Sequence, residues 1–387
     1  MNANGEAREA VARARRIVVK VGSSVLTADG ELRSQVFADI ARQIAELCDR
    51  GREVALVSSG AIAIGSRELG WTVPGRSIPE KQAAASVGQI GLIELYKQHF
   101  GVRGRQVGQI LLTRGGLEEH ERFLNARHTL LTLLRIGAVP IVNENDTVAT
   151  EEIRFGDNDN LSATVVNLVA ADLLVILTDV DGLYIEPPRA GAPRPELYDV
   201  IDGVTPEIER AAQGSASAFG RGGMTTKLEA AQSAGRRGAA TILCNGLAED
   251  AILRAAEGET FGTLFRAANR ITSRKHWLAF TTRVRGALVL DAGAVAAIEH
   301  RGKSLLPAGI SEVRGKFGIG DAIACVAEDG REIARGLVAY SSDEIRRIAG
   351  QSTANIPGVL GYSNGEEVIH RDDLVLLEEP VRSDGDA

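Results

Sequence analysis

Short apolar runs alternate with amphipathic segments over the first two thirds of the chain. Residues 17–21 form the first run, and its β-branched side chains are typical of a buried strand. Residues 34–50 then carry apolar side chains at helical spacing, with Gly51 placed to end a helix. The same alternation predicts strands at 54–57, 107–112, 139–142, 173–178 and 241–244, an edge strand at 263–265, and helices near 80–99, 121–136 and 160–171.

This alternation determines the expected fold class. Strands that alternate with helices of ten or more residues form parallel β-α-β units, whose helices cover both faces of the sheet. We therefore expect an α/β fold, a three-layer αβα sandwich with a mainly parallel sheet. After the basic segment at residues 270–275 the helical spacing mostly disappears, and strand-like runs alternate with glycine turns. That change predicts a small C-terminal β-rich domain, with strands near 287–290, 323–326 and 333–340.

The chain length agrees with two domains, because 387 residues exceed the size at which one core usually keeps growing. The predicted division is a flexible N-terminus at residues 1–15, an α/β domain at 16–269, a linker at 270–282, a β-rich domain at 283–371 and an acidic tail at 372–387.

Composition excludes several classes of protein. A hydrophobic fraction of 44% with 25% charged residues is ordinary for a globular protein, and a net charge of −7 gives no global attraction to nucleic acid or anionic membranes. The three cysteines, Cys48, Cys244 and Cys325, are too far apart for a zinc site and too few for a disulfide framework. The N-terminal residues lack the apolar core of a signal peptide. We expect a cytoplasmic protein without a membrane span.

The stretch at residues 143–159 holds the densest group of polar side chains, rich in Asn, Asp and Glu. It follows a predicted strand and leads into a predicted helix. Ligands bind at the carboxyl ends of strands in open α/β sheets, so this loop is a candidate site. A solvated acidic loop is the alternative interpretation. The amides favour a site, because asparagine both donates and accepts hydrogen bonds.

Three turns rich in glycine or serine also follow strands or open helices, at residues 22–24, 58–60 and 220–223. Backbone amides at such turns bind phosphate and carboxylate oxygens. Lys20 lies at the end of the first strand, and Lys227 lies just inside the helix after the third turn. Amide turns, two cations and nearby carboxylates together suit phosphoryl transfer, in which catalysis consists mostly of positioning and charge stabilisation.

Specific motifs recur in a fixed order along the chain. In the first domain they are VKVGSSVLT at residues 19–27, VSSGAIA at 57–63, NEND at 143–146, FGDNDNLSA at 155–163, LTD at 177–179 and GGMTTK at 222–227. In the second they are DAGA at 291–294, KSLLPAG at 303–309, GKF at 315–317 and RGL at 335–337. Together they resemble the glutamate 5-kinases of the amino acid kinase family, and the second set resembles the PUA domain that many of these proteins carry.

The resemblance implies a role for each matching residue. Lys20 and Lys227 would neutralise the transferring phosphoryl group, and Asp159 would orient them. Ser59, Gly60, Asn143, Asp146 and Asn158 match positions that bind glutamate. The positions that match nucleotide-binding residues are Lys20, Thr178, Asp179, Arg221, Gly222, Gly223, Met224, Thr225, Thr226 and Lys227. Arg221 departs from the family pattern, in which a small residue such as Thr is common.

The resemblance also implies a reaction. ATP would phosphorylate the side-chain carboxylate of L-glutamate, with Mg²⁺ carried by the ATP phosphates and no metal ligands from the protein. Inhibition by proline, a homo-oligomer (dimer or tetramer) and a downstream glutamyl phosphate reductase would follow from the same likeness.

Two alternatives remain at this point. The chain could be another amino acid kinase, such as an N-acetylglutamate kinase or an aspartokinase, although the NEND loop and the PUA-like end argue against both. It could also bind or modify RNA through the PUA-like module. Residues 283–371 contain 11 Lys and Arg and 11 Asp and Glu, so their net charge is zero. RNA binding usually requires a positive surface, so this count argues against RNA as a partner.

Overall fold

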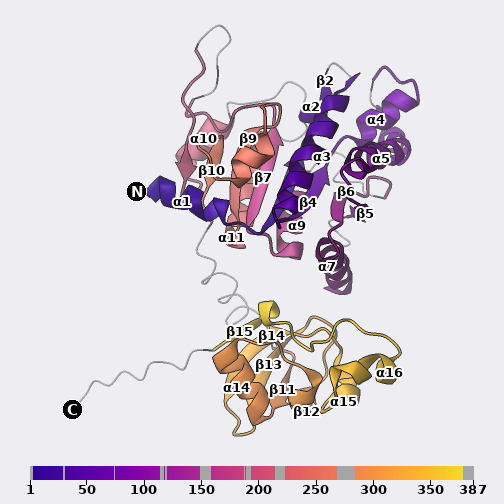
Figure 1. Ribbon diagram of the computed structural model, residues 1–387, viewed down its shortest axis with the longest axis vertical. Helices are drawn as coiled ribbons and strands as arrows, with labels where there is room; N and C mark the ends of the chain where they lie inside the picture. Colours follow the sequence, from indigo (N-terminus) through magenta and orange to yellow (C-terminus); the bar gives the residue numbers. More distant parts are fainter. Residues whose placement is uncertain are drawn as a thin grey trace, which may run out of the picture. The chain divides into compact units, whose positions relative to one another are not determined.

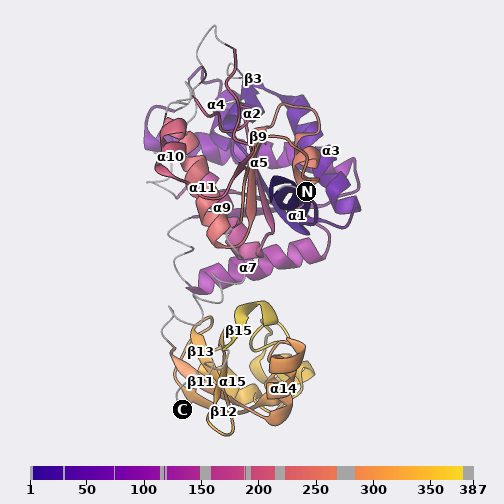
Figure 2. The same ribbon diagram turned by 90° about the vertical axis from the view of Figure 1, so that its left-hand side faces the viewer.

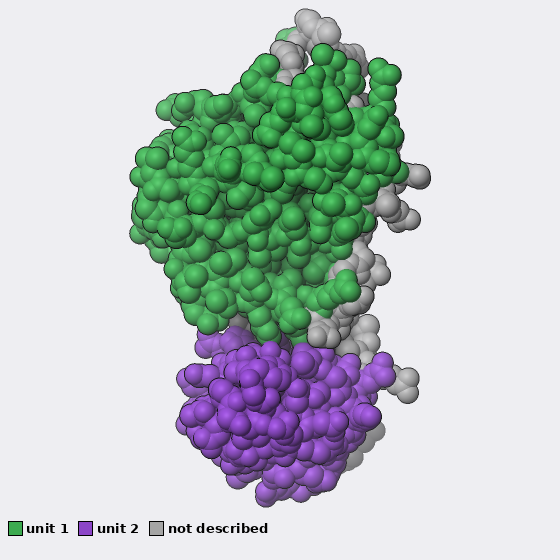
Figure 3. Space-filling view, turned by 90° about the vertical axis from the view of Figure 1, so that its right-hand side faces the viewer, with its two compact units in different colours: residues 1–270 green, residues 271–387 purple. Residues whose placement is uncertain are grey.

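A computed structural model provides the fold, and the chain forms two compact units, Met1–Arg270 and Ile271–Ala387, coloured separately in Figure 3. The structure describes residues 3–28, 31–73, 75–113, 117, 120–148, 158–186, 188, 193–213, 223–267 and 284–377. The predicted linker at residues 270–282 lies outside the described residues.

An eight-stranded sheet forms the centre of the first unit (Figure 1). Its strand order is β5-β6-β4-β1-β7-β9-β10-β8, and the pairs from β5 to β9 are all parallel. The strands are β1 Arg16–Val21, β4 Glu53–Ser58, β5 Val107–Leu112, β6 Val139–Glu144, β7 Leu173–Thr178, β8 Val200–Ile201, β9 Ala240–Asn245 and β10 Thr263–Phe265, and a separate pair contains β2 Thr27–Ala28 and β3 Glu31–Leu32.

Helices cover both faces of this sheet and enclose two hydrophobic cores. One face carries α1 Ala3–Ala12, α2 Ser23–Leu26, α3 Ser34–Asp49, α4 Ala61–Glu68, α5 Ile78–Gly101 and α12 Ala251–Ala256. The other carries α7 His120–Arg135, α9 Asn158–Val169, α10 Pro206–Gln213 and α11 Met224–Arg236. The expected three-layer αβα sandwich with a mainly parallel sheet is confirmed.

Alternation within the strands assigns side chains to the two cores. In β1, Val19 and Val21 point into the first core, whereas Val18 points into the second. Because successive side chains of a strand point to opposite faces, Lys20 shares the face of Val18, on which α9 and α11 lie. Figure 2 shows these two helices next to each other, and they are in contact.

The N-terminus differs from its prediction. Residues 1–15 were expected to be flexible, but α1 occupies residues 3–12 and Val11 is buried in the first core. Arg8 is only 5% exposed, and its Nη2 lies 2.6 Å from Asp199 Oδ1. The prediction was wrong for these residues because a polar sequence can still present one apolar side chain and one well-paired cation to a neighbouring surface.

The position of β10 was also predicted incorrectly. Residues 263–265 were expected at an edge, but β10 lies between β9, to which it is antiparallel, and the short strand β8. All three of its residues are buried. The edge is instead formed by Val200 and Ile201, a pair too short for periodicity to reveal.

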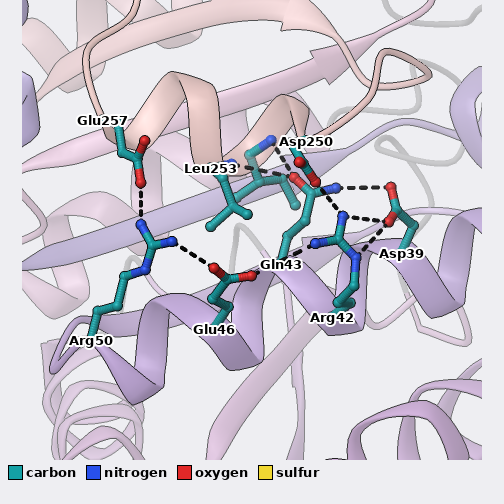
Figure 4. Close-up of polar contacts among 9 residues, drawn as sticks. Asp39, Arg42, Gln43, Glu46, Arg50, Asp250, Leu253 and Glu257 are labelled. Atoms are coloured by element: carbon teal, nitrogen blue, oxygen red, sulfur yellow. Dashed lines mark hydrogen bonds and ion pairs between the residues drawn. The ribbon is translucent and has the colours of Figure 1, made fainter.

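Gln43 on α3 replaces a missing cap on α12 (Figure 4). Its Oε1 accepts hydrogen bonds from the backbone amides of Ile252 at 2.7 Å and Leu253 at 3.3 Å. Asp250, the N-cap residue of α12, makes no capping hydrogen bond with its own side chain. Gln43 is 2% exposed, so these amides are satisfied from across the interface between two helices.

The substitution Gln43→Leu should therefore lower the free energy of unfolding by about 1–3 kcal/mol, because it leaves buried backbone amides without an acceptor. Urea denaturation at 25 °C measures this change. Gln35→Leu is the matched control, since Gln35 is an exposed glutamine on the same helix. Equal stability of the two variants would contradict the capping role.

The second unit is built on a five-stranded sheet of order β12-β11-β13-β14-β15. Its strands are β11 Gly286–Leu290, β12 Ile310–Gly315, β13 Ala322–Ala327, β14 Glu332–Leu337 and β15 Leu374–Leu376. Three α-helices, α14 Ala292–Arg301, α15 Ser342–Ile348 and α16 Ile356–Leu360, and 3-10 turns at Pro307–Gly309, Thr353–Asn355 and Arg371–Asp373 complete it. The small β-rich domain is confirmed.

One boundary of this domain needs correction. The tail was predicted to begin at residue 372, but β15 pairs with β14 and Val375 is 4% exposed. Residues 374–376 therefore belong to the sheet, whereas residues 378–387 lie outside the described residues. Among the helices that the structure describes, none is both long and apolar enough to cross a membrane.

Candidate active site

Asp159, in the first turn of α9, is the centre of the site. Its Oδ1 lies 2.6 Å from Lys20 Nζ on β1, and its Oδ2 lies 3.4 Å from Lys227 Nζ on α11. Thr226 Oγ1 donates a hydrogen bond of 2.7 Å to the same Oδ2. The carboxylate is 2% exposed and the lysine side chains 6% and 11%, so three charges are buried together.

Charge pairing determines the ionisation of this cluster. Burial by itself raises the pKa of Asp159, but the attraction of Lys20 and Lys227 and the hydrogen bonds from Lys20 and Thr226 outweigh it and lower the pKa to about 2. Burial, together with the neighbouring Lys20, lowers the pKa of Lys227, although Asp159 opposes this shift. Asp159 is therefore ionised at neutral pH and offsets the repulsion between the two ammonium groups.

Parallel strands bring these groups to one edge of the sheet. Lys20 lies near the carboxyl end of β1, Ser59 directly follows β4, and Asn143 is the last residue but one of β6. Thr178 ends β7, and its Oγ1 donates a 3.1 Å hydrogen bond to the exposed Asp179. The parallel order of β6, β4, β1 and β7 therefore collects side chains that are up to 158 residues apart in sequence, from Lys20 to Thr178.

A chain of side-chain hydrogen bonds extends from the neighbourhood of Asp159 across the site. Asn158 Nδ2 donates to Ser59 Oγ at 2.7 Å and to Asn143 Oδ1 at 3.2 Å. Asn143 Nδ2 donates in turn to Gln89 Oε1 on α5, at 2.8 Å. Asn143 and Asn158 are 2% and 9% exposed, so this polar network is buried. The predicted residues Ser59, Asn143 and Asn158 are thus brought together.

Gly60 and Asp146 flank this network. Gly60 has a φ of 112°, a conformation that favours glycine, and it is the N-cap of α4. Asp146 is half-buried in the turn after β6. The helix α4 was not predicted, because its eight residues show little apolar periodicity. Its first turn follows Ser59 and Gly60 directly in the chain.

The predicted nucleotide segment is described only in part. Arg221 and Gly222 lie outside the described residues. Gly223 is the N-cap of α11 and has no side chain with which to cap the first backbone amides, and a helix N-terminus of this kind suits an anion. Met224 is buried, Thr225 is exposed, and Thr226 and Lys227 point to Asp159. The N-terminus of α11 therefore adjoins the lysine pair.

Gln89 is the site residue that sequence reasoning missed. Its helix was predicted, but no local signal distinguishes Gln89 from Gln82 or Gln98 on the same helix. Only its hydrogen bond with Asn143 reveals its position. A helical wheel aligned on the apolar residues of α5 cannot find it, because contact with the site depends on where α5 crosses the sheet.

Comparison with known proteins agrees with the fold. The profile of the amino acid kinase family matches residues 15–245, and that of the PUA domain matches residues 286–360. The glutamate 5-kinase of Cupriavidus pinatubonensis is 52% identical over 369 residues, which cover 95% of this chain and 99% of the relative. Those of Ralstonia nicotianae and Geobacter sulfurreducens are each 50% identical and cover 96% and 95% of this chain and 99% of their own lengths.

The sheet, the buried lysine pair and the matching profile define an enzyme of the amino acid kinase class with a C-terminal PUA domain. At about half of all positions identical over nearly its whole length, the chain belongs to the glutamate 5-kinases.

Proposed function

We propose that this enzyme transfers the γ-phosphoryl group of ATP to the side-chain carboxylate of L-glutamate, forming L-glutamyl 5-phosphate, the first step of proline biosynthesis. The observation that carries the proposal is the pair of buried lysines held on one carboxylate at the carboxyl edge of a parallel sheet. Negative charge spreads over the transferring phosphoryl oxygens, and two fixed ammonium groups stabilise it without reorganisation.

The residues present fit an acceptor that is already ionised. A carboxylate needs no general base near neutral pH, and in the sequence the six histidines lie outside the motifs that contain Lys20, Asp159 and Lys227. In this proposal Asp159 fixes Lys20 and Lys227, while Ser59, Gly60, Asn143, Asp146 and Asn158 hold glutamate. The catalytic contribution is therefore positioning and charge stabilisation.

ATP and Mg²⁺ belong to the same proposal. The open N-terminus of α11 at Gly223 suits phosphate oxygens, and Thr178, Asp179 and residues 221–227 would bind the nucleotide. Mg²⁺ would be carried by the phosphates of ATP, which is how this hard cation is usually presented to kinases. In the described part of the chain no group of three His, Cys, Asp or Glu side chains could hold a metal ion by itself.

The choice of acceptor is the test of this function. The full-length protein is incubated with ATP, Mg²⁺ and hydroxylamine, and with glutamate, N-acetylglutamate or aspartate in parallel. An acyl phosphate reacts with hydroxylamine, so the hydroxamate reports phosphorylation of the acceptor. It should form with glutamate and far less with the other two compounds. Preference for N-acetylglutamate or aspartate would refute the proposal in favour of another amino acid kinase activity.

Asp146 accounts for the preference for a free amine. Burying the α-ammonium of glutamate is unfavourable unless a carboxylate meets it, and Asp146 is half-buried on the loop after β6. Asp146→Asn should weaken glutamate binding by roughly 2–5 kcal/mol, the range for breaking a buried charge pair. Saturation curves for both substrates measure this effect. An unchanged KM for glutamate, or a loss confined to ATP, would refute the assignment.

The remaining parts of the proposal concern regulation and partners. Proline, which shares an α-ammonium and an α-carboxylate with glutamate, would inhibit by competing at or near the glutamate site. The acyl phosphate product is labile in water, so a glutamyl phosphate reductase would take it up. The enzyme would act as a homo-oligomer, a dimer or a tetramer. The net charge of the PUA domain is zero over residues 283–371, and this charge argues against RNA as its partner.

A further inference from the structure

We infer that Gln89 is a specificity-determining residue that donates a hydrogen bond to the α-carboxylate of the amino acid substrate. This inference rests on the proposed function and adds a residue that the motifs do not contain. It begins from two unsatisfied polar atoms at the ends of a hydrogen-bonded series of three side-chain amides, Asn158, Asn143 and Gln89, called the amide chain here.

Each end of the amide chain presents one unused group. Gln89 Nε2, a donor, and Asn158 Oδ1, an acceptor, are buried and make no hydrogen bond with any residue that the structure describes. A buried polar atom without a partner costs about 1–3 kcal/mol, so two within one network point to a ligand that pairs with both. In the amide orientations of the structure, the unpaired donor is on Gln89 and the unpaired acceptor is on Asn158.

The direction of the amide chain indicates which end of the substrate meets Gln89. The chain starts at Asn158, which is adjacent to the catalytic Asp159 in sequence, and it ends on α5. The carboxylate that accepts the phosphoryl group must lie near the lysines. Gln89 therefore contacts the opposite end of the amino acid, where the α-carboxylate and α-ammonium are attached to one carbon.

A second contact places α5 beside the loop that holds Asp146. Ser86 Oγ on α5 lies 3.4 Å from Thr147 Oγ1, and Thr147 is the neighbour of Asp146. Ser86 and Gln89 are three residues apart on the helix, so they share a face, which lies along the carboxyl end of β6. Asp146 would pair with the α-ammonium, and the Gln89 amide with the α-carboxylate beside it.

The packing of α5 explains why this geometry is rigid. Gly88 precedes Gln89, and a Cβ built on Gly88 would lie 1.9 Å from the carbonyl oxygen of Ala61 on α4. The backbones of the two helices are thus in direct contact at this position. A side chain next to such a contact has little freedom to move, which suits a residue that selects its ligand by position.

Gln89→Leu tests the inference, because leucine retains apolar volume but has no donor. The KM for glutamate, and its Kd by calorimetry, should rise about 10- to 150-fold, the range for a hydrogen bond to a charged group. kcat and the KM for ATP should change little. Gln89→Glu should raise the KM further, since it places an anion opposite the α-carboxylate. Gln98→Leu, an exposed glutamine on the same helix, should match the wild type.

A chemical change in the substrate completes the test. In glutamate α-amide the α-carboxylate is replaced by a neutral carboxamide, so the penalty of Gln89→Leu should be much smaller with this analogue than with glutamate. Equal penalties with both compounds, or an unchanged glutamate Kd, would overturn the inference. If the wild type binds glutamate without phosphorylating it, the proposed function fails, while the Kd values still decide the role of Gln89.

Discussion

Replacing Asp159 with asparagine should lower kcat by roughly 10²–10³-fold, the effect of removing one preorganised group that stabilises a transition state. Lys20 and Lys227 both lie on this carboxylate, so the substitution leaves two buried cations that repel each other. The KM values for ATP and glutamate should change less, because in the proposed mechanism the lysines act on charge that develops during transfer. Steady-state kinetics on the full-length variant measures both quantities.

The same substitution should change stability and pH dependence. Breaking a buried ion pair costs about 3–5 kcal/mol, which urea denaturation would detect. Because the folded-state pKa of Asp159 is lowered from 3.8 to about 2, its contribution is fully present above pH 3.8 and is lost as pH falls through 2. The stability difference between wild type and variant should therefore be constant near neutral pH and shrink under acid conditions. The charge of Asp159 opposes the lowering of the Lys227 pKa, so without Asp159 this lysine should deprotonate at lower pH and activity should decline earlier on the alkaline side.

Asp49→Asn is the matched control, since Asp49 also pairs with a cation, Arg105, but is 70% exposed. Exposed pairs contribute about 0–1 kcal/mol, so this variant should resemble the wild type. If Asp159→Asn does not fold, Thr226→Val removes only the hydroxyl that donates to Asp159 and provides a milder probe. Near-normal kcat in Asp159→Asn would exclude Asp159 from the catalytic machinery.

Replacing Gly88 with alanine should destabilise the first unit by about 3 kcal/mol, the upper part of the usual range for overpacking. A Cβ on Gly88 would lie 1.9 Å from Ala61 O and 2.2 Å from Gly65 N, and both are backbone atoms. Since the backbone of α4 cannot rotate away as a side chain can, the two helices must separate. Gln89 would move with α5, so the KM for glutamate should rise as well.

Gly101→Ala is the control for Gly88→Ala. Gly101 is on the same helix, and a Cβ built there meets nothing within 4 Å. Alanine at this position should be neutral or stabilising by up to about 1 kcal/mol, because it reduces the entropy of the unfolded chain. Urea denaturation of both variants measures the contrast. Equal stability of the two would show that α4 and α5 do not pack through their backbones at Gly88.

The amino-acid sequence by itself determined the elements and the chemistry that they carry. The β-branched runs and amphipathic segments predicted six of the parallel strands and their helices, because strand and helix periods are local properties. The loss of helical spacing near residue 270 indicated a second domain for the same reason. Lys20 and Lys227 could be singled out beside turns rich in glycine or serine, whereas the candidate roles of both lysines and of Asp159 came from motifs that resemble a known family.

Tertiary structure decided which of these parts meet. Lys20 and Lys227 reach Asp159 from positions that are 139 and 68 residues away in sequence, and the order of the strands together with the packing of α9 against α11 brings them together. The helix α1 is held by Val11, which is buried in the first core, and by Arg8, which pairs with the distant Asp199. Gln89 joins the site only because glycines let α5 approach α4 closely. Local periodicity contains no information about such distant contacts, because they depend on the order in which strands pair and on how closely helices pack.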